Sequence, residues 1–250
     1  NEWKKQYLAQ FELLTKKLIK KYEIELPQLQ TVVKLLHAIL NRDFIWNIRD
    51  ANLIASQFMR SGLLYRSSSL SRYLKDEYLK KTLIGLKVKS LLDLRAPNEK
   101  KEQDHYISFL KNLGIEYNEI PISQKELGYE YKLKLSTPGS LDSFSEVFPR
   151  YYQEEIRNIL LDVITMEKPL LIHCHAGRDR TGLVIALIQS ILGFSKQEVI
   201  QDYLNTGLGT NKDGITIFFK VLEEFGGITE YIKHIGLSSD YIIRLKETFN

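Results

Sequence analysis

The sequence predicts an α/β fold in which a central, mostly parallel sheet is flanked by helices, with an N-terminal helical extension in front of it. Three short apolar runs predict strands, and they lie in GLKVKSLLDLR, GIEYNEIPI and KPLLIHC. Helical patterns such as DHYISFLKNL and YYQEEIRNILLDVIT separate these runs. Strands that alternate with helices favour a parallel or mixed sheet that is covered on both faces.

The predicted helices divide the chain into an extension, residues 1–40, and a main domain, residues 41–250. In the extension, residues 2–22 place apolar side chains at helical spacing between lysines, and LQTVVKLLHAILN predicts a second helix. In the main domain, RTGLVIALIQSIL is apolar on nearly all sides. It therefore predicts a buried central helix, which ends at Gly193.

The next helix opens with SKQE, a capping-box pattern formed by Ser195 and Glu198. The C-terminal tail that follows predicts two or three further short helices. Residues 123–143 contain Gly, Pro and Ser between charged residues and predict a mobile loop. Whether this loop covers a site as a lid stays open.

Composition bounds the class of protein. The chain has 250 residues, of which 44% are hydrophobic and 26% charged, as in an ordinary globular protein. Its net charge of +4 suits anionic substrates but is far from the dense basic stripes of a nucleic-acid binder. One cysteine excludes a disulfide framework, a zinc ribbon and a CxxC redox pair. We expect no metal or organic cofactor.

The chain lacks the patterns that direct a protein into or across a membrane. No apolar run reaches the roughly 18 to 20 residues that a membrane span requires, and NEWKKQYLAQ is not a signal-peptide pattern. We expect a cytoplasmic protein, or an effector exported without a recognisable signal peptide.

The only cysteine lies in HCHAGRDRTG, residues 173–182, between a predicted strand and a predicted helix. Cys174 and Arg180 form the pattern C-x5-R. A turn from the carboxyl end of a strand to the amino end of a helix points backbone N–H groups at one spot, where the helix dipole helps to bind a tetrahedral oxyanion. Gly177 lets the loop curl back where a side chain would clash.

This loop has the parts needed for chemistry at phosphorus. Its field stabilises a thiolate at Cys174, and Arg180 offers a planar fork to two phosphate oxygens. A nucleophile beside an anion-binding nest predicts displacement through a phosphocysteine intermediate. The alternative for Cys174 is a buried structural thiol, which leaves Gly177, Arg180 and Thr181 unexplained.

HCHAGRDRTG resembles the signature of the cysteine-dependent tyrosine and dual-specificity phosphatases. It is most similar to the bacterial branch of tyrosine/phosphoinositide phosphatases whose loop is of the HCxAGKDRTG type. NIRD at 47–50, GLLYRSSSLS at 62–71 and SLLDLRAPNE at 90–99 resemble the early segments of that branch, and EFGGITEYIKHIGLSSDYIIRLK resembles its tail. Ala51 and Asn52 stand where the branch carries two glycines. The resemblance implies a protein tyrosine phosphatase-like fold from about residue 44 to the end.

The resemblance also implies roles around the nucleophile. Thr181, or another hydroxyl near Cys174, helps the sulfur to leave when water attacks. His173 lies at the strand end and supports the loop through hydrogen bonds. The alternative, a core histidine whose hydrogen bonds are satisfied, predicts nearly the same contacts.

Two aspartates compete for the role of the general acid that protonates the leaving oxygen. Many dual-specificity phosphatases carry this acid on a separate loop about thirty residues before the cysteine, and Asp142 is 32 residues before Cys174. The branch with AGKDR loops implies Asp179 instead, and we favour it. The alternative to a catalytic role is that Asp142 begins a helix and that Asp179 forms an ion pair with Arg178 or a hydrogen bond within the loop.

Three charged residues outside the loop are further candidates. Asp93 and Arg95, in LLDLR, lie at the carboxyl end of a strand, where sites collect in such sheets. Asp93 is a candidate for substrate binding and Arg95 for support, but bracing of the cysteine loop explains both at least as well. Arg66, in YRSSSLS, is either a brace or a substrate contact.

The loop also bears on the substrate. Ala176 and Gly177 offer backbone to the phosphoryl group. His175 and Arg178 occupy the offsets at which lipid phosphatases carry basic residues that contact further phosphates on an inositol ring. The expected partners are a phosphorylated protein and an inositol phosphate or phosphoinositide, and peripheral membrane contact through KKLIKKY stays open. The alternative function is a catalytically weak phosphate-binding module of the same fold.

Overall fold

The fold was analysed in a computed structural model. It describes residues 45, 47–53, 56–73, 77–100, 103–123, 140–207, 210 and 212–250, and for residues 72 and 140–143 the backbone alone. The predicted helical extension, residues 1–40, and most of the predicted loop at 123–143 lie outside the described residues.

A five-stranded sheet with the order β1-β2-β5-β3-β4 forms the centre of the described fold. Its strands are β1 (Arg49–Asp50), β2 (Leu64–Ser67), β3 (Ser90–Asp93), β4 (Glu116–Glu119) and β5 (Leu170–His173). Only β1 runs antiparallel to its neighbour, and the other pairs are parallel. The predicted α/β fold with a mostly parallel sheet is thus confirmed.

The register of the three inner strands brings their carboxyl ends level. Ser67 of β2 and Asp93 of β3 both pair with His173 of β5. The residue after His173 is Cys174, so the loop leaves the sheet from its middle strand with β2 on one side and β3 on the other.

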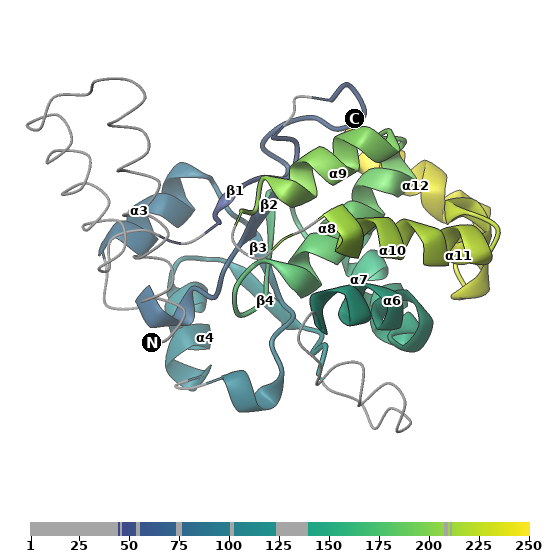
Figure 1. Ribbon diagram of the computed structural model, residues 1–250. Coiled ribbons are helices and arrows are strands. Elements are labelled where there is room, and N and C mark those ends of the chain that lie inside the picture. The colour runs from purple at the N-terminus through teal and green to yellow at the C-terminus, as the bar shows by residue number, and fades with distance from the viewer. Residues whose placement is uncertain are drawn as a thin grey trace, which may run out of the picture. The chain divides into compact units, whose positions relative to one another are not determined.

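Helices cover both faces of the sheet (Figure 1). They are α3 (Glu77–Gly85), α4 (Gln103–Asn112), α6 (Ser140–Tyr151), α7 (Gln153–Thr165), α8 (Asp179–Leu192), α9 (Lys196–Leu204), α10 (Lys212–Glu224), α11 (Ile228–His234) and α12 (Ser239–Phe249). Figure 1 shows α3 and α4 on one side of the sheet and the other helices on the opposite side.

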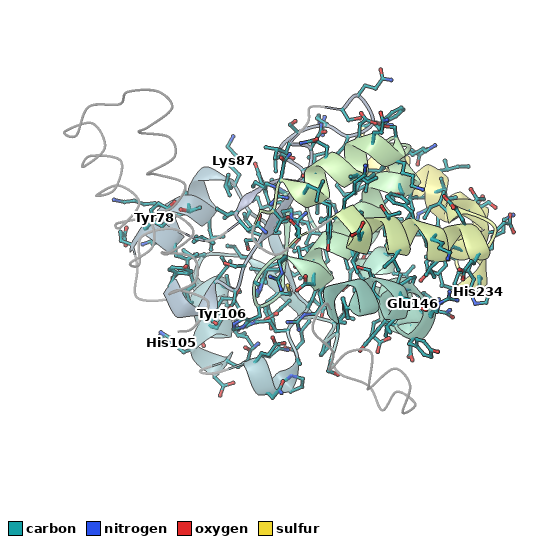
Figure 2. All side chains as sticks on the ribbon, viewed as in Figure 1. Tyr78, Lys87, His105, Tyr106, Glu146 and His234 are labelled. Carbon is teal, nitrogen blue, oxygen red and sulfur yellow. The ribbon has the colours of Figure 1, made fainter. Side chains whose placement is uncertain are left out.

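Alternation along the strands divides the core in two. Leu91 and Leu171 belong to the cluster that packs under α3 and α4, whereas their chain neighbours Leu92 and Ile172 belong to the larger cluster under α6 to α12. Successive strand residues point to opposite faces, so strands buried on both faces need continuous apolar runs. Figure 2 shows the side chains of both layers, with Tyr106 on the α4 side.

The predicted central helix is confirmed as α8, which is buried along almost its whole length. It ends at Gly193, whose φ of 110° lies in the left-handed region. The capping box at the start of α9 is also confirmed. The Ser195 hydroxyl accepts a bond from the backbone N–H of Glu198, and the Glu198 carboxylate accepts one from the N–H of Ser195.

The predicted tail of two or three short helices corresponds to α10, α11 and α12. Strands β1 and β2 are not predicted from the sequence, because they are short and polar; β2 reads LYRS. Among the described helices, none has the length and apolarity needed to span a bilayer.

Candidate active site

The loop at residues 174–178 connects the middle strand β5 to the amino end of α8. Cys174 is 2% exposed and begins this loop at the carboxyl edge of the sheet. Arg180 and Thr181 lie in the first turn of α8. The predicted order of strand, cysteine loop and helix is therefore present, and the positive end of the α8 dipole faces the loop.

Gly177 is required by the shape of the loop. Its φ of +66° lies in the left-handed region, and a Cβ atom there would come within 2.3 Å of the backbone oxygen of Ser67 and 2.7 Å of the nitrogen of Ser68. Both obstacles are backbone atoms, which have no rotamer to move away. The loop thus packs against the end of β2 at a distance that only glycine permits.

Arg180 is oriented by Glu99. Both terminal nitrogens of Arg180 donate to the Glu99 carboxylate, with Nη2 at 2.7 Å from Oε1, and Nη1 also lies 3.3 Å from the carbonyl oxygen of Ile122. Burial opposes ionisation of Glu99, but the hydrogen bonds from Arg180 and from the Ala96 N–H outweigh it and hold the pKa of Glu99 below its usual value. A charged pair of this geometry fixes the plane of the guanidinium beside the loop.

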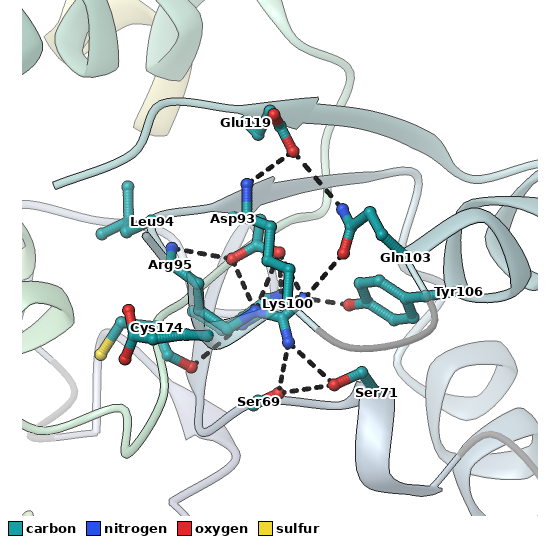
Figure 3. A network of polar contacts seen from close by, with 12 residues as sticks. Ser69, Ser71, Asp93, Leu94, Arg95, Lys100, Gln103, Tyr106, Glu119 and Cys174 are labelled. Atoms are coloured by element: carbon teal, nitrogen blue, oxygen red, sulfur yellow. Dashed lines mark hydrogen bonds and ion pairs between the residues drawn. The ribbon is translucent and has the colours of Figure 1, made fainter. Parts of the chain in front are cut away.

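A buried polar network lies behind the cysteine (Figure 3). Arg95 binds Asp93 through Nε and Nη2, with Nη2 at 2.7 Å from Oδ2, and its Nη1 donates to the hydroxyls of Ser69 and Ser71. The backbone N–H of Ser69 in turn donates to the carbonyl of His175, at 3.0 Å. Asp93 and Arg95 thus hold the segment after β2 against the loop.

His173 continues this network to the cysteine. Its Nδ1 lies 3.1 Å from the carbonyl oxygen of Cys174, and its Nε2 lies 3.1 Å from the hydroxyl of Tyr106. Burial lowers the pKa of His173 despite the nearby carboxylate of Asp93. The imidazole is therefore neutral near pH 7, and with Nδ1 protonated it donates to the Cys174 carbonyl.

Asp93 and Arg66 are both fully buried. Asp93 contacts Arg95, Tyr117 and His173. Arg66 Nη2 donates to the carbonyl of Gly177, at 2.9 Å. The sequence leaves open whether Asp93 and Arg66 contact the substrate or brace the cysteine loop. Their burial favours bracing.

The exposed part of the loop carries the residues predicted to face a substrate. The His175 side chain is 57% exposed, and the Arg178 side chain is 31% exposed. Arg178 Nε donates to Asp179 Oδ1 at 3.0 Å, so the ion pair considered for Asp179 is present. Ala176 lies between these residues and is partly exposed.

The remaining two candidates differ in how much of them is described. Thr181 is fully buried, and its hydroxyl has no hydrogen-bond partner among the described residues. Asp142 belongs to the backbone of α6, but its side chain lies outside the described residues. The Thr181 hydroxyl is therefore available to donate a hydrogen bond. The role of Asp142 as a general acid stays a prediction.

The model of the tyrosine phosphatase family matches residues 40–217. This chain belongs to the tyrosine phosphatase family. The triple specificity protein phosphatase PtpB of Mycobacterium tuberculosis is 28% identical over 189 residues, which cover 64% of this chain and 66% of PtpB. A tyrosine-protein phosphatase of Nostoc commune is 22% identical over 198 residues, covering 66% of this chain and 67% of that protein.

The chain thus spans about two thirds of the length of these relatives. Among solved structures, the core catalytic domain of the PP-IP phosphatase SIW14 from S. cerevisiae is 21% identical, with a TM-score of 0.44. The match covers 68% of this chain and 89% of that domain.

Glu99, which orients Arg180, is not predicted from the sequence. Glu99 closes the short helix Pro97–Glu99 after β3 and reaches Arg180 across 81 residues of chain. The available signal was its position, since it follows the strand that ends at Asp93 by only six residues. Asn47, which contacts the loop directly, lies in the NIRD segment that resembles the family but is assigned no role, whereas Asp202 and Thr206, which contact Arg66, give no signal.

The clash at Gly177 generates a prediction. We expect Gly177→Ala to weaken binding of inorganic phosphate by more than roughly tenfold, because the loop must shift away from β2 and lose its inward N–H groups. Isothermal titration with phosphate measures the affinity, and urea denaturation measures the free energy of unfolding.

Gly114→Ala is the matched control. Gly114 has a similar φ of +69°, but a Cβ atom there meets no heavy atom within 4 Å. It therefore reports the left-handed backbone penalty alone, about 1–2 kcal/mol. Equal phosphate affinities in the two variants would contradict the close approach of Gly177 to β2.

Proposed function

We propose that this protein is a phosphoric monoester hydrolase, a cysteine-dependent protein-tyrosine or dual-specificity phosphatase that also acts on phosphoinositides or inositol phosphates. The observation that carries the proposal is the position of Cys174, the sole cysteine, in a loop between the middle strand and the amino end of α8. Family membership supports the same activity.

The first chemical step follows from this geometry. Cys174 Sγ, as a thiolate, attacks phosphorus and forms an S–P bond while the bond from phosphorus to the leaving oxygen breaks. The leaving oxygen takes a proton from the general acid. Arg180 and the loop N–H groups stabilise the negative charge on the oxygens that remain on phosphorus.

The second step regenerates the enzyme. Water attacks phosphorus and gives a proton to the deprotonated acid, and the S–P bond breaks to release inorganic phosphate and the thiolate. Thr181, whose buried hydroxyl is unpaired among the described residues, is proposed to donate a hydrogen bond to the departing sulfur.

Asp179 is the favoured general acid. It begins α8 directly after the loop, and its carboxylate accepts a hydrogen bond from Arg178 of the loop. Asp142 remains the alternative, on a different helix.

Multiply phosphorylated substrates fit the exposed part of the loop. His175 and Arg178 follow the cysteine at the first and fourth positions after it, and the Arg178 guanidinium offers a planar fork of donors to a further phosphate. The triple specificity in the name of PtpB supports a broad choice of substrate.

The first prediction tests the activity itself. The purified protein is expected to release phosphate from phosphotyrosine peptides, phosphoinositides and soluble inositol phosphates. Cys174→Ser should reduce each rate by at least roughly a thousandfold, because the nucleophile is lost. Absence of release from all substrates, with binding of inorganic phosphate retained, would instead support the phosphate-binding module.

The second prediction separates the two acids. Asp179→Asn is expected to slow turnover of a substrate with a poor leaving group by about a hundredfold or more, and Asp142→Asn by much less, because protonation by a general acid contributes about that much. Turnover of an activated aryl phosphate is the comparison, since its leaving group needs little protonation. A loss of less than about tenfold in both variants would remove both assignments.

The third prediction concerns the substrate. Arg178→Ala should reduce turnover of phosphoinositides severalfold more than turnover of an aryl phosphate, because a contact to an additional phosphate is lost. The aryl phosphate also controls for the freed Asp179, which serves both reactions. Arg150→Ala, on the ion-paired surface of α6, is the control for loss of an arginine. An equal loss on both substrates would contradict the bias.

A further inference from the structure

A loop that directs its N–H groups at an anion must direct its carbonyl groups away from it, because the peptide unit is planar and its N–H and C=O point in opposite directions. Carbonyl groups that are removed from water in this way need donors. Backbone N–H groups and His173 supply several of them. The carbonyl of His173 accepts from Leu94 N at 2.8 Å, that of Cys174 lies against His173 Nδ1 at 3.1 Å, and that of His175 accepts from Ser69 N at 3.0 Å.

The carbonyl of Gly177 is held differently, by two side chains. Asn47 Nδ2 donates to it at 2.7 Å, and Arg66 Nη2 donates to it at 2.9 Å. Asn47 lies 130 residues before Gly177 in the chain and Arg66 lies 111 residues before it. Both donors therefore belong to the tertiary structure and not to the local fold of the loop.

A cluster of buried polar groups aims these donors. Arg66 Nη1 lies 3.2 Å from Asp202 Oδ2, and Arg66 Nη2 also donates to the Thr206 hydroxyl at 3.1 Å. Arg49 contacts the same two residues and donates to the side-chain oxygen of Asn47. The amide of Asn47 is thus fixed at both ends, with its oxygen on Arg49 and its nitrogen on the loop.

The cluster also carries charge. Asp202 is shared between two guanidinium groups, so one positive charge is in excess behind the loop. Burial lowers the pKa of Arg66, and the negative charges of Asp202 and Cys174 act against that shift. A buried cation is costly without an anion nearby, and an anion in the loop would supply one.

From these contacts we infer that Asn47 is a positioning residue of the anion site. Together with Arg66 it holds the Gly177 carbonyl outward, and since Gly177 and Arg178 share one peptide unit, it thereby holds the Arg178 N–H toward the anion. The donor from the charged Arg66 also polarises this peptide and strengthens its N–H as a donor. The role of Asn47 in catalysis rests on the proposed function. Its role in binding an anion does not require turnover.

Asn47→Gly is the sharpest variant. Asn47 has a φ of 60°, which glycine adopts without strain, so the change removes the amide and leaves the backbone conformation accessible. In the Cys174→Ser background, the affinity for inorganic phosphate is expected to fall roughly five- to tenfold, as for loss of one partly buried hydrogen bond. With active protein, kcat/KM for p-nitrophenyl phosphate should fall by a similar factor.

Asn52→Ala is the matched control. Asn52 is buried, and its Nδ2 donates to two backbone carbonyls, those of Ser56 and Met59, in the turn after β1. The variant removes the same chemical group from a structural role that does not touch the loop. It should lower Tm without changing the affinity for phosphate by more than about twofold.

Each outcome decides the inference. A folded Asn47→Gly protein that binds phosphate within twofold of its parent would overturn it, as would an equal loss in Asn52→Ala or absence of phosphate binding in Cys174→Ser. If Asn47→Gly does not fold, Asn47→Asp keeps the shape and the oxygen for Arg49 but replaces the donor by a carboxylate oxygen, which repels the Gly177 carbonyl, so a loss of affinity at least as large is expected. If the protein with Cys174 intact shows no turnover while Asn47→Gly still weakens phosphate binding, the proposed function is refuted and the positioning role stands.

Discussion

The described site depends on one constraint, that the carbonyl groups of the loop at residues 174–178 find hydrogen-bond donors outside the loop. Because each peptide unit is planar, a loop that points its N–H groups at one anion turns its carbonyl groups away from it, and these carbonyl groups then need other donors. The end of β2, the end of β3 and the side chain of His173 meet that demand. Their positions follow from the register that ends three parallel strands at the same level.

The same requirement explains why so many charged side chains are buried at one end of the sheet. Arg66, Asp93, Arg95 and Asp202 are each at most 1% exposed. Removing a charge from water is costly unless it is paired and hydrogen-bonded, and these four form two sets, Asp93 with Arg95 on one side of β5 and Asp202 with Arg66 on the other. Arg66 donates directly to the Gly177 carbonyl, whereas Arg95 reaches the loop through Ser69, whose N–H donates to the His175 carbonyl, so the two sets fix the geometry of the site on both flanks.

The apolar core consists of two clusters, and each supports a different part of the site. The cluster under α3 and α4 supports the face on which His173 and Tyr106 meet, and the larger cluster supports α8, which carries Arg180 and Thr181. Since α8 is buried on nearly all sides, its first turn has little freedom to move relative to β5. Cys174 and the first turn of α8, which carries Arg180, are therefore held by the same core.

The elements around the candidate site differ in whether they could be predicted from residues close together in the sequence. The strand, the cysteine loop, the following helix and the capping box of Ser195 are all predicted, because each depends on residues a few positions apart whose chemistry the sequence displays directly. The strands β1 and β2 are not, since they are two and four residues long and their charged and polar residues form no apolar run. Of the alternatives left open for Arg66 and Asp93, burial favours the brace.

By itself, then, the sequence determined the α/β class, the position of the nucleophile and the glycine that its loop requires. Only the tertiary structure decided that Glu99 orients Arg180 and that Asn47 and Arg66 hold Gly177, across 81, 130 and 111 residues of chain. The physical reason is that a local pattern specifies which groups need partners, whereas strand order and register specify which distant residues arrive within hydrogen-bond distance.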